Sequence, residues 1–154
     1  MRQIKRSDEL RLTKGITGFD AEHLIEQDMR MFQSMVYHLV TSEQRAKVWQ
    51  FIDQPHCVYM QAVVEIDGKM LAILHHRLMP YIAIAKYTEE LSFTFLTMPQ
   101  LHKYFPMRKC LEAATLTTLL TKDQALHSLS AMEWKYVSYF NSQTIGDVMF
   151  NTWD

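Results

Sequence analysis

The sequence predicts a single α+β domain over residues 1–154, built on an antiparallel sheet of about four to six strands. Two N-terminal helices and a short C-terminal helix are expected to pack on one face of that sheet. Three observations lead to this prediction. Apolar residues recur every three or four positions in the first third of the chain, they follow a strand-like pattern around Asp67-Gly68, and a helical stripe returns at the end. No repeat, linker or change of composition marks a second domain.

Residues 1–18 are polar and contain Gly15 and Gly18, which predicts a short edge strand followed by a loop. The first helix is expected over about residues 21–40, because Asp20 is a good N-cap and Phe19 and Leu24 have the spacing of a hydrophobic staple. Its apolar stripe consists of Ile25, Met29, Phe32, Val36 and Leu39.

A second, shorter helix is expected directly after the first. Thr41 and Gln44 have the spacing of a capping box, and the apolar residues Val48, Phe51 and Ile52 follow at intervals of three and one. Pro55 disfavours helical geometry at the residue before it, so the helix should end there.

The segment 57–78 predicts a β-hairpin, because Asp67-Gly68 tolerates the positive φ angles of a type I′ turn. In that register Ile66 faces Lys69, and alternation then fixes the two faces. One face should pack on the helices and includes His75; its apolar members are Val58, Met60, Ala62, Val64, Ile66, Leu71 and Ile73. The opposite face is mixed: Cys57, Tyr59, Gln61, Val63, Glu65, Met70, Ala72, Leu74 and His76.

Two more strands, over 81–87 and 91–96, complete a four-stranded antiparallel meander. Residues 98–109 are expected to form a short helical or irregular connection bounded by prolines. Residues 110–120 fit either a helix or a strand, and their β-branched threonines favour a strand.

The C-terminal region should contain a helix, a strand and a closing helix. The helix is expected over 125–132 and the strand over 134–140, where aromatic residues alternate with other types. Ser142 is a plausible cap for the closing helix, whose stripe is Ile145, Val148, Met149 and Trp153.

Composition and charge exclude several classes of protein. The chain is 48% hydrophobic and 21% charged, which is typical of a globular protein. The formal net charge of −1 supplies no overall positive field for nucleic acid or an anionic membrane. A local N-terminal patch is the alternative for nucleic-acid binding: Arg2, Lys5, Arg6, Arg11 and Lys14, offset by Asp8 and Glu9.

The cysteines and the apolar stretches bear on the compartment. Cys57 and Cys110 form no C-x-x-C pair and are too few for a disulfide framework, so we expect reduced thiols in a cytoplasmic protein, with one Cys57–Cys110 bridge as the alternative. Residues 1–8 turn polar and acidic where a signal peptide needs an apolar core. Polar residues interrupt every apolar stretch before the ~20 residues that a membrane helix needs.

Few residue patterns point to chemistry. With only 4 glycines, the chain lacks the glycine-rich motifs that hold nucleotide phosphates, although Gly15 and Gly18 ahead of a predicted helix leave an anion site as an alternative. Cys57 and His76 share a sheet face, but two ligands do not make a metal site, so no metal and no cofactor are predicted. Whether Cys57 and His76 form a nucleophile–base pair stays open. No catalytic residue is predicted.

The 11 methionines and the aromatic residues are the remaining signal. They favour a non-enzymatic protein-binding or regulatory module that associates with another protein or with itself as a homodimer. Tyr139, Phe150 and Trp153 are the predicted interface residues. The alternative is a small-molecule-binding or catalytic cup between the first helix and the sheet, with these lining residues: Tyr59, Met70, Leu74 and His76.

Overall fold

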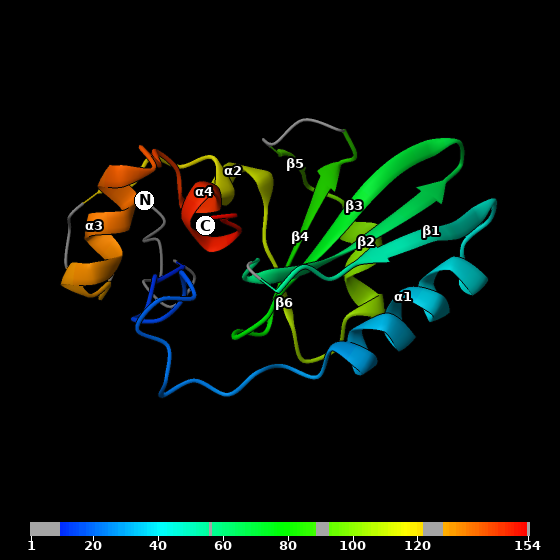
Figure 1. The fold of residues 1–154 in the computed structure, drawn as a ribbon. Coiled ribbons are helices and arrows are strands. Elements are labelled where there is room, and N and C mark those ends of the chain that lie inside the picture. Colours follow the sequence, from blue (N-terminus) through cyan, green and yellow to red (C-terminus); the bar gives the residue numbers. More distant parts are fainter. Residues whose placement is uncertain (1–9, 56, 89–92, 122–127, 154) are drawn as a thin grey trace, which may run out of the picture.

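The computed structural model describes residues 10–55, 57–88, 93–121 and 128–153. The described elements follow in the order α1 (Met29–Ser42), β1 (Ala46–Ile52), β2 (Tyr59–Ile66), β3 (Lys69–His76), β4 (Tyr81–Lys86), β5 (Thr94–Leu96), η2 (Pro99–Tyr104), β6 (Lys109–Cys110), α2 (Ala113–Leu116), α3 (Ala131–Tyr139) and α4 (Ile145–Met149). Figure 1 shows α1 beside the strands, with α3 and α4 at the other end of the molecule. The predicted α+β class with an antiparallel sheet is confirmed.

The strands are arranged in the order β1-β2-β3-β4-β5, and each neighbouring pair is antiparallel. The short strand β6 pairs with β4 in the parallel direction. The predicted hairpin is confirmed in its register: Ile66 lies opposite Lys69. The turn residues Asp67 and Gly68 both have positive φ, at 51° and 81°, as a type I′ turn requires.

The first helix is confirmed, but it begins at Met29 and not near residue 21. Asp28 is its N-cap, and the Asp28 side chain accepts hydrogen bonds from the backbone N–H groups of Arg30 and Met31 at 3.0 and 3.1 Å. Asp20, the predicted cap, instead has a positive φ of 52°. Gln27 N donates to the carbonyl of Arg77 at 2.7 Å, so a contact with a segment distant in sequence holds the residues before α1.

The predicted second helix over 41–54 is wrong. These residues contain strand β1, in which Val48 lies opposite Val64 and Phe51 lies opposite Ala62. The apolar spacing that suggested a helix also fits a strand with one extra residue, and the register does shift between Val48 and Gln50. Trp49 occupies that bulge.

Helices cover both faces of the sheet, so the prediction that all of them pack on one face is wrong. The face that carries Met60 and Ile73 packs against α1 and η2, as the alternation predicted, through the fully buried Phe32, Val36 and Leu39. The opposite face belongs to a second core cluster that also contains residues of the N-terminal loop, α2, α3 and α4. Small side chains on that face allow the close packing of irregular segments: Ala72, Ala83 and Ala85.

The region 98–121 is partly as predicted. Helix η2 lies in the segment expected to be a short helical or irregular connection. The strand favoured over 110–120 is wrong beyond Cys110, because α2 occupies residues 113–116. The predicted N-terminal edge strand falls largely on residues 1–9, which lie outside the described residues, and residues 13–18 form the expected loop.

Near the C-terminus, helix α3 replaces the strand predicted over 134–140. Ser130 and Glu133 form a capping box, in which each side chain accepts from the other residue's backbone N–H. Most of the helix predicted over 125–132 lies outside the described residues, since 122–127 are not described. The closing helix is confirmed as α4, with Thr144 as its cap in place of Ser142.

Gly146 lies where α4 meets α2 and β5, and we expect Gly146→Ala to destabilise the protein by about 2 kcal/mol. A Cβ atom there would lie 2.5 Å from Phe95 Cε2 and 2.9 Å from the carbonyl oxygen of Leu116. This overlap outweighs the helix propensity of alanine, which alone would stabilise the helix by about 1 kcal/mol. Urea unfolding measures the difference, with Ser138→Ala on the exposed side of α3 as the neutral control. A variant as stable as the wild type would contradict this packing.

Candidate functional site

The predicted ligand residues do not lie between the first helix and the sheet. Tyr59, Leu74 and His76 are 6%, 0% and 0% exposed, and they lie on the face that points away from α1. Met70 is half-buried opposite Glu65, also on the mixed side of the hairpin. The predicted position of the cup was therefore wrong, because α1 covers the purely apolar face and not the mixed one. Ligand binding by these residues remains a prediction.

His76 is a buried structural histidine. Its Nε2 donates to the carbonyl of Ile16 at 2.7 Å, and its Nδ1 accepts from the backbone N–H of Leu78 at 3.0 Å. Both ring nitrogens are therefore engaged, and in this arrangement neither is available as a base for Cys57. Burial lowers the pKa of His76 from 6.5 to about 4.

His75 is held in the same way on the α1 side of the sheet, where the alternation placed it. Its Nδ1 donates to the carbonyl of His76 at 2.6 Å, and its Nε2 accepts from Nε of Arg108 at 3.0 Å. The ring also meets Phe32 edge-on, with centroids 5.2 Å apart. Burial is the main cause that lowers the pKa of His75 to about 4, and the Arg108 charge adds to it.

Neither Cys57 nor Cys110 forms a disulfide. Cys57 donates to Oε1 of Gln54 at 3.5 Å, and burial raises the pKa of the Cys110 thiol to about 11. Burial also raises the pKa of the Tyr59 hydroxyl, which lies beside Cys57. Within the described residues, no group of three or more metal-ligating side chains comes together.

Three buried side chains hold the N-terminal loop, and we call Glu133, Asn151 and His76 the loop clasp. Glu133 is 0% exposed and accepts from the backbone N–H groups of Gly15 and Thr17 at 3.0 and 3.3 Å, and also from the Thr17 hydroxyl. Asn151 donates to the carbonyl of Thr17 at 2.9 Å. The clasp therefore joins β3, α3 and the C-terminal tail through a single loop.

Sequence reasoning missed Glu133 and Asn151. The spacing of Ser130 and Glu133 is a capping-box signal, which could have predicted the start of α3. No local signal could have predicted that the same carboxylate also binds a loop that lies 116 to 118 residues away.

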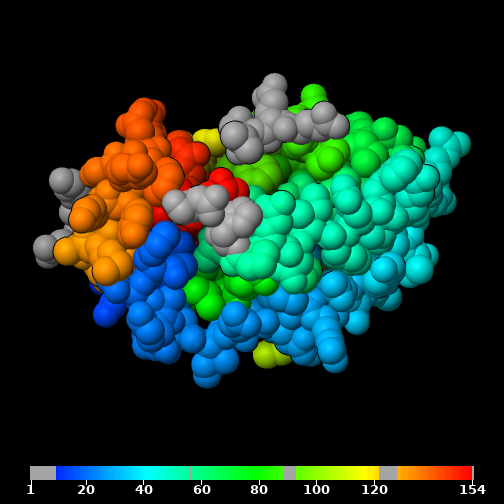
Figure 2. Space-filling view, in the orientation of Figure 1, coloured from blue at the N-terminus to red at the C-terminus, as the bar shows by residue number. Residues whose placement is uncertain are grey.

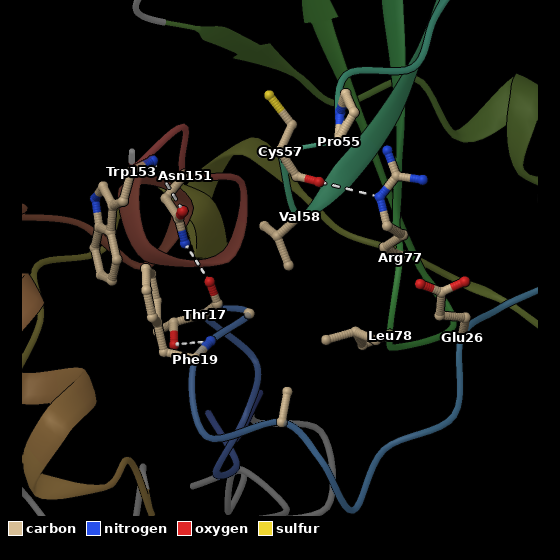
Figure 3. Close-up of a pocket in the computed structure, with 12 residues that line it drawn as sticks. Thr17, Phe19, Glu26, Pro55, Cys57, Val58, Arg77, Leu78, Asn151 and Trp153 are labelled. Carbon is tan, nitrogen blue, oxygen red and sulfur yellow. Dashed lines mark hydrogen bonds between the residues drawn. The ribbon is translucent and has the colours of Figure 1, made fainter.

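A pocket of about 260 Å³ lies next to the loop clasp. In Figure 3, Arg77, Leu78 and Glu26 form one side, whereas Asn151 and Trp153 form the other. The guanidinium group of Arg77 turns away from Glu26 and donates to the carbonyl of Cys57 at 3.0 Å, and it also pairs with Asp53. The positive charge of Arg77 is therefore paired with the Asp53 carboxylate within the fold.

The predicted interface residues divide into two groups. Phe150 and Trp153 are only 3% and 7% exposed, so their assignment to an interface was wrong. Trp153 stacks on Phe140 with an angle of 3° between the ring planes, so it is part of the hydrophobic core. Tyr139 is 79% exposed and stays a candidate for contact with a partner.

Two other aromatic side chains are exposed, one on strand β1 and one on helix α1. Trp49 in β1 and Tyr37 in α1 are 55% and 54% exposed. The Trp49 ring lies 4.0 Å from the Lys47 ammonium, and its Nε1 donates to Oε1 of Glu65 at 3.2 Å. The Tyr37 ring packs on Phe51 with centroids 5.6 Å apart. Both aromatic side chains therefore contact neighbouring side chains although they face solvent.

Comparison with protein-family models, curated proteins and solved structures finds no match for this chain. In the part of the chain that the structure describes, no helix is both long and apolar enough to cross a membrane.

Proposed function

We propose that this chain is a non-enzymatic protein-binding module whose contact surface is centred on Trp49. The observation that carries the proposal is an exposed indole ring that two neighbours already hold, Lys47 through its charge and Glu65 through a hydrogen bond. Tryptophan is enriched among the residues that dominate binding energy at interfaces. A side chain that is ordered before binding loses less conformational entropy when the partner arrives.

The position of Trp49 in the fold supports the same function. β1 is the last strand in the described order of the sheet, so its outer edge has no neighbouring strand among the described residues. The bulge at Trp49 interrupts the regular pleat of that edge, and bulges at sheet edges commonly redirect a side chain. We expect the partner to be a protein with an apolar pocket for the indole ring of Trp49. An acidic group beside that pocket would pair with Lys47, and a basic group would pair with Glu65.

A further feature favours binding over catalysis. The buried polar side chains of the described residues are engaged inside the fold, as the loop clasp and the His75–Arg108 bond illustrate. A cytoplasmic location is part of the proposal, and the reduced state of Cys57 and Cys110, which form no disulfide, supports it.

The test places a photo-crosslinking amino acid at Gln50, an exposed neighbour of Trp49, in cells that produce the protein. We expect a covalent adduct with one partner of defined mass, and we expect Trp49→Ala to remove most of it. Loss of an aromatic anchor weakens binding about 30-fold, equivalent to about 2 kcal/mol.

The matched controls are the same crosslinker at Thr118, which is exposed on another part of the surface, and Leu119→Ala in place of Trp49→Ala. Neither should change the adduct. An adduct at Gln50 that persists at full yield in Trp49→Ala, or no adduct above the Thr118 control, would refute the proposed surface.

A further inference from the structure

Two exposed apolar side chains lie outside the Trp49 surface. Met107 and Ile25 are 96% and 84% exposed, the highest values among the large hydrophobic side chains of the described residues. Neither belongs to a helix or a strand. Met107 also has a positive φ of 63°, and the Arg108 guanidinium next to it donates to the carbonyl of Pro106 at 3.1 Å. Local contacts thus hold the loop that presents Met107.

These two residues lie in segments of opposite charge. The segment 20–28, which contains Ile25, has four carboxylates and neither lysine nor arginine: Asp20, Glu22, Glu26 and Asp28. The segment 102–109, which contains Met107, has three basic residues and no carboxylate: Lys103, Arg108 and Lys109. Because the net charge of the whole chain is only −1, this separation of charge is local.

Both segments lie at the same end of the sheet. Gln27 N donates to the carbonyl of Arg77 at 2.7 Å, and Lys109 N donates to the carbonyl of Pro80 at 2.8 Å. Each segment is therefore fixed to the connection between β3 and β4. Figure 2 shows the blue 20–28 segment along the lower rim, with yellow-green atoms of the 102–109 segment below it. Among the described residues, no ion pair joins the two segments.

We propose that a second copy of this chain docks on this side of the molecule about a two-fold axis. The acidic segment 20–28 of each copy then lies against the basic segment 102–109 of the other, and Ile25 and Met107 supply the apolar contact. In a two-fold dimer the same surface patch of each copy contacts that of the other. A patch that has an acidic and a basic segment is therefore complementary to itself. The exposed carboxylates and ammonium groups favour this orientation of encounter.

This homodimer does not depend on the Trp49 surface, which it leaves free for a different protein. The test is a charge swap on the full chain, measured by native mass spectrometry and light scattering over a range of concentrations. One variant carries Glu22→Lys and Glu26→Lys, and the other carries Lys103→Glu and Lys109→Glu. Arg108 is left unchanged because its Nε donates to His75.

We expect the wild type to dimerise, with weaker association at high salt. Each charge variant alone should dimerise at least about tenfold more weakly, because the attraction is lost at both contacts. Glu22→Lys with Glu26→Lys leaves segment 20–28 without net charge, and Lys103→Glu with Lys109→Glu gives segment 102–109 a net charge of −1. An equimolar mixture of the two variants should form a heterodimer. One contact then pairs the unchanged acidic segment with the unchanged basic segment, and at the other contact the introduced lysines meet the introduced glutamates. This rescue also shows that the variants are folded.

Met107→Ser should weaken the dimer while Leu119→Ser, at a residue 66% exposed elsewhere, should not. A wild type that stays monomeric at all concentrations, or charge variants that dimerise like the wild type, would overturn the inference. A dimer that Trp49→Ala breaks and charge reversal leaves intact would also overturn it, and would assign self-association to the Trp49 surface instead.

Discussion

Lowering the pH from 7 to 5 should reduce the free energy of unfolding by about 3–4 kcal/mol, because His75 and His76 are both buried in the neutral form. Each ring has one nitrogen that donates and one that accepts. A proton added to the accepting nitrogen would face a donor, the guanidinium of Arg108 for His75 and the N–H of Leu78 for His76. Protonation therefore requires that these contacts break.

The direction of this pH effect follows from the two pKa values. Burial lowers the pKa of both histidines to about 4 in the folded chain, whereas the ordinary value is 6.5. Between these values the unfolded chain binds more protons than the folded chain, so acid favours unfolding. The contribution is fully present above pH 6.5, falls as the pH drops below it, and at pH 5 has decreased by about 2 kcal/mol for each histidine.

Urea unfolding at a series of pH values tests this prediction. His76→Gln should reduce stability at pH 7 but also flatten its dependence on pH, since one of the two titrating groups is gone. His38→Gln, at an exposed position of α1, should leave the dependence unchanged. If the wild type is as stable at pH 5 as at pH 7, the buried neutral histidines do not govern acid stability.

Glu133→Ala should destabilise the protein by about 4 kcal/mol, since it leaves several buried donors without an acceptor, each worth about 1–3 kcal/mol. The Glu133 carboxylate accepts from the N–H groups of Gly15, Thr17 and Ser130, and from the Thr17 hydroxyl. Gly15 and Thr17 are themselves buried, so water replaces these bonds poorly. The loop should then detach from α3 before the sheet unfolds.

Hydrogen exchange at Gly15 and Thr17, together with urea unfolding, measures both parts of this prediction. Glu133→Gln keeps one acceptor oxygen but sets an amide donor near the N–H of Thr17, so it should cost about half as much as Glu133→Ala. Glu112→Ala is the control, because this exposed carboxylate makes no capping bond to α2. If Glu133→Ala and Glu112→Ala had the same free energy of unfolding, the hydrogen bonds of Glu133 would not contribute to stability.

Local chemistry was sufficient to predict the central hairpin. Asp67 and Gly68 determine the turn, and the turn determines the register and both faces. β1 could not be predicted in the same way, because Val48, Phe51 and Ile52 fit a helix as well as a bulged strand. Only pairing with β2, a non-local contact, distinguishes the two.

The candidate sites were harder to predict for a similar reason. Aromatic residues near the C-terminus suggested an interface. In the structure, however, Phe150 packs against Tyr59, and Trp153 packs against Phe19 and Phe140. Trp49 was assigned to a helix and therefore was not considered as a surface residue. The partner of His75 is Arg108, a contact 33 residues away along the chain that no local pattern predicts.

The loop clasp also determines when the protein can finish folding during its synthesis. Thr17 leaves the ribosome before Asn151, and the hydrogen bond between them spans 134 residues, so it forms only after Asn151 has emerged. Contacts of such long range form slowly, because a large loop of chain must close first. Until then the aromatic rings of Phe19, Tyr136 and Trp153, which later pack together, stay available to chaperones or to neighbouring nascent chains.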